Sequence, residues 1–128
     1  MAEMSNFLEN ALINATLRNT TYTSVATVYV SLWTSDPKVA GSGTEVSGGS
    51  YARSAVTLGA PSNGVTTNSA DVTFPTATAS WGTVGWIGIN DAATSGNLLY
   101  HSPLDTSKTI DSGDIFKIST GNLSVTLA

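Results

Sequence analysis

The stretch from Ala70 to Tyr100 constrains the fold more than any other part of the chain. Val72 and Phe74 alternate with polar residues, which is the period-2 pattern of a half-buried strand, and Pro75 ends that pattern. The segment Asp91–Asn97 consists of small and polar residues with one glycine, a composition typical of a turn. The order strand, loop, strand, turn, strand predicts the core of an antiparallel β domain.

The segment Thr83–Asn90 predicts the central strand of that core. It is apolar on both of its faces, with Val84 and Trp86 expected on one face and Ile87 and Ile89 on the other. A strand that is apolar on both faces is more typical of the middle of a sheet than of its edge.

Short strands at nearly regular spacing are predicted along the rest of the chain. They are Val25–Thr34, Tyr51–Leu58, Asn97–His101, Asp114–Ser119 and Leu123–Leu127. The Asn63-Gly64 pair predicts a tight turn, and Pro103–Asp111 predicts a polar connection. We therefore expect an all-β fold with one short N-terminal helix, built as an antiparallel β-sandwich or barrel of about seven or eight strands.

The only predicted helix runs from Ser5 to Arg18, with Ser5 as its N-cap. Phe7, Leu8 and Leu12 contribute to an apolar face. This helix either covers one end of the β core or acts as an arm that binds a neighbouring subunit. We divide the chain accordingly into an N-terminal helical segment, residues 1–19, and a single β domain, residues 20–128.

Composition excludes several classes of function. The net charge is −4, and the five basic residues are scattered, so we expect no nucleic-acid partner. The chain has no cysteine, which removes disulfides and thiolate chemistry. No segment resembles a signal peptide or a membrane span, so we expect synthesis in a cytoplasm and no membrane partner. Charged residues make up only 11%, while 19 Thr and 17 Ser predict polar but weakly ionic strand surfaces.

No motif predicts catalysis or a cofactor. Asp111-Ser112-Gly113 matches the catalytic tripeptide of aspartic proteases, but Asp114 follows it and no apolar strand precedes it, so a solvated turn is the better interpretation. His101 is the only histidine, and we interpret it as a strand residue that caps a turn. A calcium site at Asp105, Asp111 and Asp114 lacks the spacing of an EF-hand loop. We expect no enzyme, no metal and no cofactor.

The glycine- and serine-rich segment Val39–Ser50 predicts an exposed contact loop. The expected contacts of the protein with other chains are Phe7, Leu8, Leu12, Glu45, Tyr51 and Trp81. The tryptophans fit a core role best, although Trp81 follows a polar loop and could instead anchor an interface. Tyr51 and Trp81 together could also stack on a sugar.

Several motifs together resemble a known family. They include Gly-Gly-Ser-Tyr-Ala-Arg at residues 48–53 and the Phe-Pro…Trp-Gly…Gly-Ile-x-Asp-Ala pattern at residues 74–92. The chain is similar over nearly its whole length to small structural proteins of tailed bacteriophages, often described only as phage proteins or tail fibre proteins. The resemblance implies a virion component with an all-β body and brings no catalytic residues with it.

Two roles are compatible with this resemblance. In the first, the protein is a capsid decoration or cement protein on the capsid exterior, whose partners are the major capsid protein and copies of itself in dimers or trimers. In the second, it is a tail or fibre component that binds a host receptor. The absence of a repetitive shaft sequence favours the first role.

Overall fold

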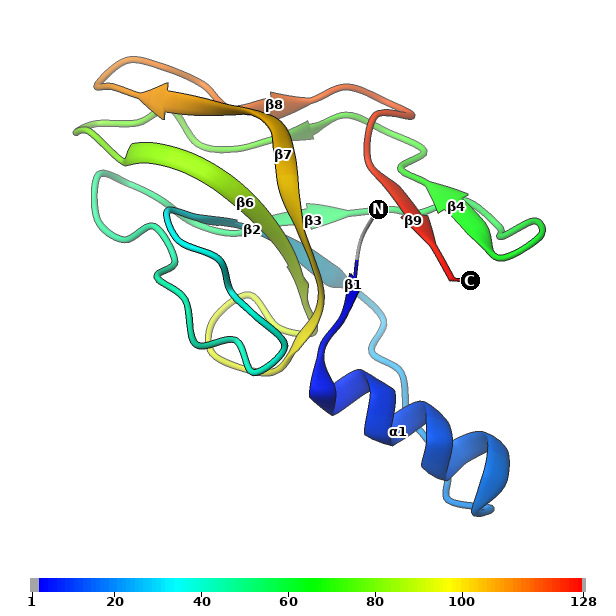
Figure 1. Cartoon of the computed structure of the whole chain (residues 1–128). Helices are drawn as coiled ribbons and strands as arrows, with labels where there is room; N and C mark the ends of the chain where they lie inside the picture. Colours follow the sequence, from blue (N-terminus) through cyan, green and yellow to red (C-terminus); the bar gives the residue numbers. More distant parts are fainter. Residues whose placement is uncertain (1–2, 128) are drawn as a thin grey trace.

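The computed structural model describes residues 3–127, and these residues form one helix and nine short strands (Figure 1). In chain order the elements are β1 (Glu3–Met4), α1 (Asn6–Leu17), β2 (Val28–Trp33), β3 (Ser54–Val56), β4 (Val65–Thr67), β5 (Val72–Thr73), β6 (Gly82–Asn90), β7 (Leu98–Ile110), β8 (Lys117–Ile118) and β9 (Ser124–Thr126). All strand pairs are antiparallel. The predicted all-β class with a short N-terminal helix is confirmed.

The strands form one large sheet and two small ones. The large sheet has the order β1-β7-β6-β2-β3, while β4 pairs with β9 and β5 pairs with β8. The strand β6 therefore lies in the middle of the large sheet, as its apolar faces predicted. Within residues 3–127 the sheets do not close into a barrel, and the arrangement is sandwich-like.

The main core fills the space between the large sheet and the two small sheets. Its completely or almost completely buried members come from both sides: Val30, Leu32, Val84 and Ile89 from the large sheet, and Val72, Phe74, Phe116, Leu123 and Val125 from the segments of the small sheets. Packing of this apolar surface away from water is the main force that holds the layers together.

The other face of the large sheet carries a second buried layer. The side chain of Trp33 donates a hydrogen bond from Nε1 to Ser31 Oγ (2.8 Å), and Ser31 Oγ donates to Asn90 Oδ1 (2.7 Å). Gly88 lies beneath this pair, and a Cβ there would stand 2.7 Å from Leu98 Cδ1 and 2.8 Å from Ser31 Oγ. A side chain at this position would have to displace Leu98 and the Ser31–Trp33 pair, so β6 is closely packed on both faces at its centre.

The predicted faces of β6 are wrong at one end. Val84 shares the main core with Ile87, whereas Trp86 is not a member of that core. The register of β6 with β7 shifts between Val84 and Trp86, so the irregularity at Gly85 brings Val84 round to the side of Ile87. Simple alternation along the sequence cannot reveal such a bulge.

The predicted polar connection Pro103–Asp111 is also wrong, because β7 continues through to Ile110. Trp86 pairs with Pro103 and Val84 pairs with Lys108, so four residues of β7, 104–107, stand opposite the single residue Gly85. Proline has no N–H to donate to the ladder, which suits it to the edge of such a bulge. Most of the residues from 105 to 109 are exposed, which is why this strand has the composition of a loop.

Asn68 joins the two small sheets. Its side chain is buried and donates from Nδ2 to the carbonyl oxygens of Ala70 (2.9 Å) and Ser119 (3.1 Å). Its Oδ1 accepts from the backbone N–H groups of Gly121 (3.0 Å) and Leu123 (2.9 Å). One amide group thus satisfies four backbone groups at the point where β8 turns into β9.

We predict that Asn68→Ala lowers the free energy of unfolding by on the order of 3 kcal/mol, because it removes four hydrogen bonds in a part-buried network, including the one to the N–H of buried Leu123. Exposed Asn122, in the same turn, is the matched control, and Asn122→Ala should change stability by less than about 0.5 kcal/mol. Urea denaturation of the two variants checks this. Equal stabilities for the two variants would show that the Asn68 network is not structurally important.

Candidate functional site

Two regions hold the predicted contact residues. The first is the N-terminal arm, which we define as residues 3–17, made of β1 and α1, and it carries Phe7, Leu8 and Leu12. The second is the polar clamp, which we define as Glu45, Tyr51 and Arg53, with Trp81 packed beside it.

The arm is fixed to the β body at Ser5. The backbone N–H of Ser5 donates to the carbonyl oxygen of Leu99 (2.8 Å), and its hydroxyl donates to the carbonyl oxygen of Leu98. The same hydroxyl oxygen accepts from the N–H of Leu8 (3.2 Å), which makes Ser5 the N-cap of α1, as predicted. The next residue, Asn6, donates its N–H to the carbonyl oxygen of Val39 (2.9 Å).

Beyond its first turn, α1 extends away from the strands (Figure 1). Leu8 is buried and Leu12 is half-buried, whereas Phe7 is 41% exposed, Ile13 52% and Leu17 78%. Ile13 and Leu17 are one helical turn apart and so lie on the same side of α1. The helix is thus apolar on the side facing the body and also on a side facing solvent. The spacing of Ile13 and Leu17 is visible in the sequence, but neither residue is among the predicted contacts Phe7, Leu8 and Leu12.

The polar clamp ties the long loop before β3 to the sheet. Arg53 binds Glu45 through two nearly parallel hydrogen bonds, from Nε (2.9 Å) and from Nη2 (2.8 Å). Tyr51 donates its hydroxyl proton to Glu45 Oε2 (2.7 Å), and the same hydroxyl oxygen accepts from the N–H of Leu32 (2.9 Å). Burial, followed by the hydrogen bond to Glu45, raises the pKa of Tyr51 well above its ordinary value.

Arg53 also reaches a second loop. Its Nη1 donates to the carbonyl oxygens of Ala92 (2.9 Å) and Ser95 (2.8 Å) in the turn between β6 and β7. The hydrogen bonds with Glu45 raise the pKa of Arg53 further, so the guanidinium stays charged. Arg53 therefore links two loops that are about forty residues apart in the chain. The sequence does not reveal this link, because Ala92 and Ser95 lie about forty residues from Arg53 in the chain.

Trp81 belongs to the core and not to the surface. It is 4% exposed, its ring meets the Tyr51 ring edge-on at 5.4 Å, and its Nε1 donates to the carbonyl oxygen of Gly49 (2.9 Å). A Cβ at Gly49 would stand 2.9 Å from Trp81 Nε1, so the Gly-Gly-Ser-Tyr-Ala-Arg motif serves packing. The expectation that Tyr51 and Trp81 form an exposed sugar-stacking surface is wrong. Leu8 and Trp81 bury their side chains within this chain.

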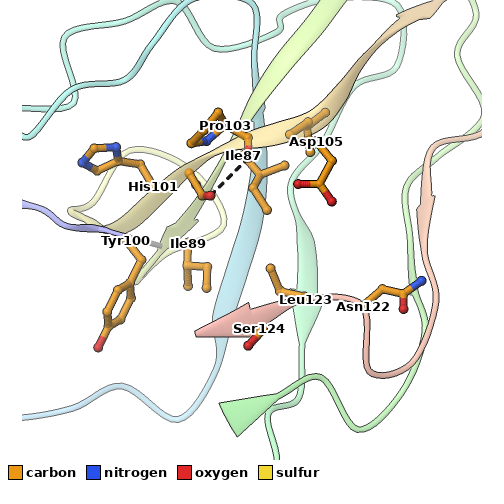
Figure 2. A pocket seen from close by; sticks show the side chains of 12 residues that line it. Ile87, Ile89, Tyr100, His101, Pro103, Asp105, Asn122, Leu123 and Ser124 are labelled. Atoms are coloured by element: carbon orange, nitrogen blue, oxygen red, sulfur yellow. Dashed lines mark hydrogen bonds between the residues drawn. The ribbon is translucent and has the colours of Figure 1, made fainter. Parts of the chain in front are cut away.

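A pocket of about 260 Å³ lies between β7 and β9 (Figure 2). Its floor is apolar, from Ile87, Ile89 and Leu123, and its rim carries Asp105 and Asn122 among other polar groups. This volume is slightly below the range typical of small-molecule sites, and the pocket follows the seam where the large sheet and the β4–β9 sheet meet without pairing. We interpret it as part of that seam.

The other candidates for chemistry lie apart from one another. His101 is a buried residue of β7, so its predicted position in a strand is confirmed; its Nε2 has no hydrogen-bond partner among the described residues and lies 3.9 Å from Glu3 Oε2. Asp111 begins an exposed turn, in which its N–H donates to Asp114 Oδ2 (2.9 Å). Among residues 3–127 no three His, Cys, Asp or Glu side chains form a group that could hold a metal ion.

No described helix is long and apolar enough to cross a membrane.

The fold is a β body with a helix that exposes the apolar side chains of Phe7, Ile13 and Leu17. Residues 3–126 match the family model described as podophage GP4 fiber I protein gp80, and the chain belongs to this family. It is therefore a fibre or structural protein of a tailed phage, which agrees with the resemblance found in the sequence. No curated protein matches the chain.

We predict that Arg53→Met lowers the free energy of unfolding by about 3 kcal/mol, because it leaves Glu45 and two carbonyl groups without their partner. Lys117→Met is the matched control, since Lys117 pairs with Asp71 (3.2 Å) but both side chains are about half exposed. Breaking such a surface pair should cost less than about 1 kcal/mol. Chemical denaturation measures both values, and similar losses for the two variants would contradict a structural role for the clamp.

Proposed function

We propose that this protein is a subunit of a virion fibre and that it joins neighbouring virion chains through α1. The observation that carries this proposal is the exposed apolar side of α1, together with the family match to a fiber protein. The partners are further copies of the chain, as dimers or trimers, and the chain on which the fibre stands.

The physical argument concerns the surface of α1. On the solvent-facing side of α1, Ile13 and Leu17 lie one helical turn apart among exposed polar residues. Phe7, Ile13 and Leu17 expose apolar area while Glu9 is the only charged residue within the helix. Covering this side with another chain removes that area from water and provides the driving force for assembly.

The clamp and the loop around it have a different role in this proposal. The side chains of Glu45, Tyr51 and Arg53 form hydrogen bonds with one another and with nearby backbone groups. They hold the loop 39–50 in shape and leave its exposed residues, such as Thr44 and Ser47, at the surface. In a fibre subunit held at α1, this loop is the surface that we assign to the host receptor.

A capsid decoration protein is the second candidate, with the major capsid protein as its partner on the capsid exterior. Two features favour it: the chain has no repeated segment of the kind that builds a fibre shaft, and only 11% of its residues are charged. In this role α1 would bridge capsomers, and many copies that bind only the mature shell would stabilise it by mass action.

The number of copies per purified virion separates the two candidates. A fibre subunit should be present in a small number of copies, in multiples of three or six, as the symmetry of a fibre requires. Quantitative mass spectrometry against the major capsid protein measures this number. A count of hundreds, in a fixed ratio to the capsid protein, would overturn the fibre proposal and support decoration.

We predict that the double variant Ile13→Ser/Leu17→Ser weakens incorporation into virions by on the order of 100-fold. Two apolar side chains buried at an interface contribute roughly 1.5 kcal/mol each or more, and 1.4 kcal/mol corresponds to a tenfold change in affinity. The stability of the isolated β body should not fall, since both side chains are exposed in the single chain.

The matched control is Asn10→Ser/Thr16→Ser, which changes two exposed polar residues of the same helix. Both variants are supplied from a plasmid to a phage that lacks the gene, and the protein is quantified in purified particles. Normal incorporation of Ile13→Ser/Leu17→Ser would show that α1 does not carry the attachment.

A further inference from the structure

The N-terminal arm makes its hydrogen bonds to the β body through its first few residues. Glu3 and Met4 pair with His101 and Tyr100 at the edge of β7, Ser5 bonds to the carbonyl groups of Leu98 and Leu99, and Leu8 is buried. These contacts form a short plug, residues 3–8, in a socket formed by the β7 edge at residues 98–101 and by Val39. After the plug, α1 runs outward from the body (Figure 1).

The linker that follows α1 has few contacts that would fix its conformation. Residues 18–27 contain no helix or strand, and nearly all of them are exposed. No backbone hydrogen bond joins residues 21–27 to another described residue. Ten residues can span up to roughly 33 Å when extended. The half-buried Tyr22 interacts with Tyr100 of β7, and this interaction is lost when the arm leaves. The other linker residues are exposed, so the linker can release the arm from its own body and let it reach a neighbouring one at little further cost.

We propose that the N-terminal arm exchanges between copies of this chain, so that the socket of one copy holds the plug of the next. The strand pairing of the plug and its hydrogen bonds to the β body are with residues 39 and 98–101, and a second copy supplies the same residues with the same geometry. The exchanged and closed forms thus have the same plug contacts, which makes exchange a low-cost route to assembly. This inference rests on the proposed self-assembly through the N-terminal segment.

Local concentration decides between the closed and the exchanged form. A flexible linker holds the plug near its own socket at an effective concentration of the order of millimolar. Dilute protein therefore closes on itself, while copies gathered on a particle exceed that concentration and exchange. Leu17 directly precedes the linker and Val25 lies within it, and both side chains are exposed. In the exchanged form the linkers of two copies run beside each other and can cover them.

The chain has no cysteine, so engineered cysteines report directly on exchange. One chain carries Glu3→Cys and a second, with a different affinity tag, carries His101→Cys. These residues are register partners, and facing residues of an antiparallel pair lie about 4.5–5.5 Å apart at Cα, within reach of a disulfide. The chains are co-expressed, concentrated to millimolar levels and oxidised, and a non-reducing gel shows any covalent heterodimer.

The control pair is Thr83→Cys with Thr109→Cys on separate chains. These exposed register partners link β6 to β7, so a disulfide in trans would require opening of the β body. We expect at least ten times more heterodimer from the Glu3/His101 pair than from this control. If His101→Cys does not fold, Met4→Cys with Tyr100→Cys tests the same register.

A chain that carries both Glu3→Cys and His101→Cys completes the experiment. Exchange predicts covalent dimers or a ladder at high concentration, and cross-linked monomers at micromolar concentration. Cross-linked monomers at every concentration, with a heterodimer band no stronger than the control, would overturn the exchange. That result combined with loss of incorporation by Ile13→Ser/Leu17→Ser would leave the proposed fibre function standing.

Discussion

Burial of β6 on both faces is the constraint on which the rest of the structure depends. One face of β6 packs Val84 and Ile89 into the core between the sheets. On the other face, Gly88 leaves room for the layer of Trp33 and Leu98. That second layer ends at the edge of β7, where Ser5 docks. The strand β6 pairs with β7, and β7 binds Ser5, so the strand that organises the core also supports the site where the N-terminal arm docks.

The chain holds its long loops with specific polar contacts and uses few charges to do so. Arg53 connects the loop before β3 to the turn after β6, and Asn68 connects the two small sheets. Both side chains are largely buried and bind several backbone groups, which makes each one worth more than a surface ion pair. A rigid body built in this way can carry its loops and its helix in fixed directions on a particle.

The sequence predicts the local features, which depend on residues close together in the chain. The N-cap Ser5 is correctly predicted, and so is the tight turn at Asn63-Gly64, where both residues have positive φ. What depends on distant partners was missed: the bulge opposite Gly85, the continuation of β7 beyond Pro103, and the bonds of Arg53 to residues 45, 92 and 95. The sequence allows two roles for Trp81, a core residue or an interface anchor. Its contacts with Gly49 and Tyr51 place it in the core.

The central claim is that the N-terminal helix attaches this fibre-family protein to its neighbours while the β body stays as it is in the single chain. A cryo-electron microscopy reconstruction of the virion, resolved well enough to place side chains, tests it most directly. The account predicts that Ile13 and Leu17 are covered by another chain and that the clamp is unchanged. A reconstruction in which both residues face solvent, while a loop of the β body makes the attachment, would contradict it.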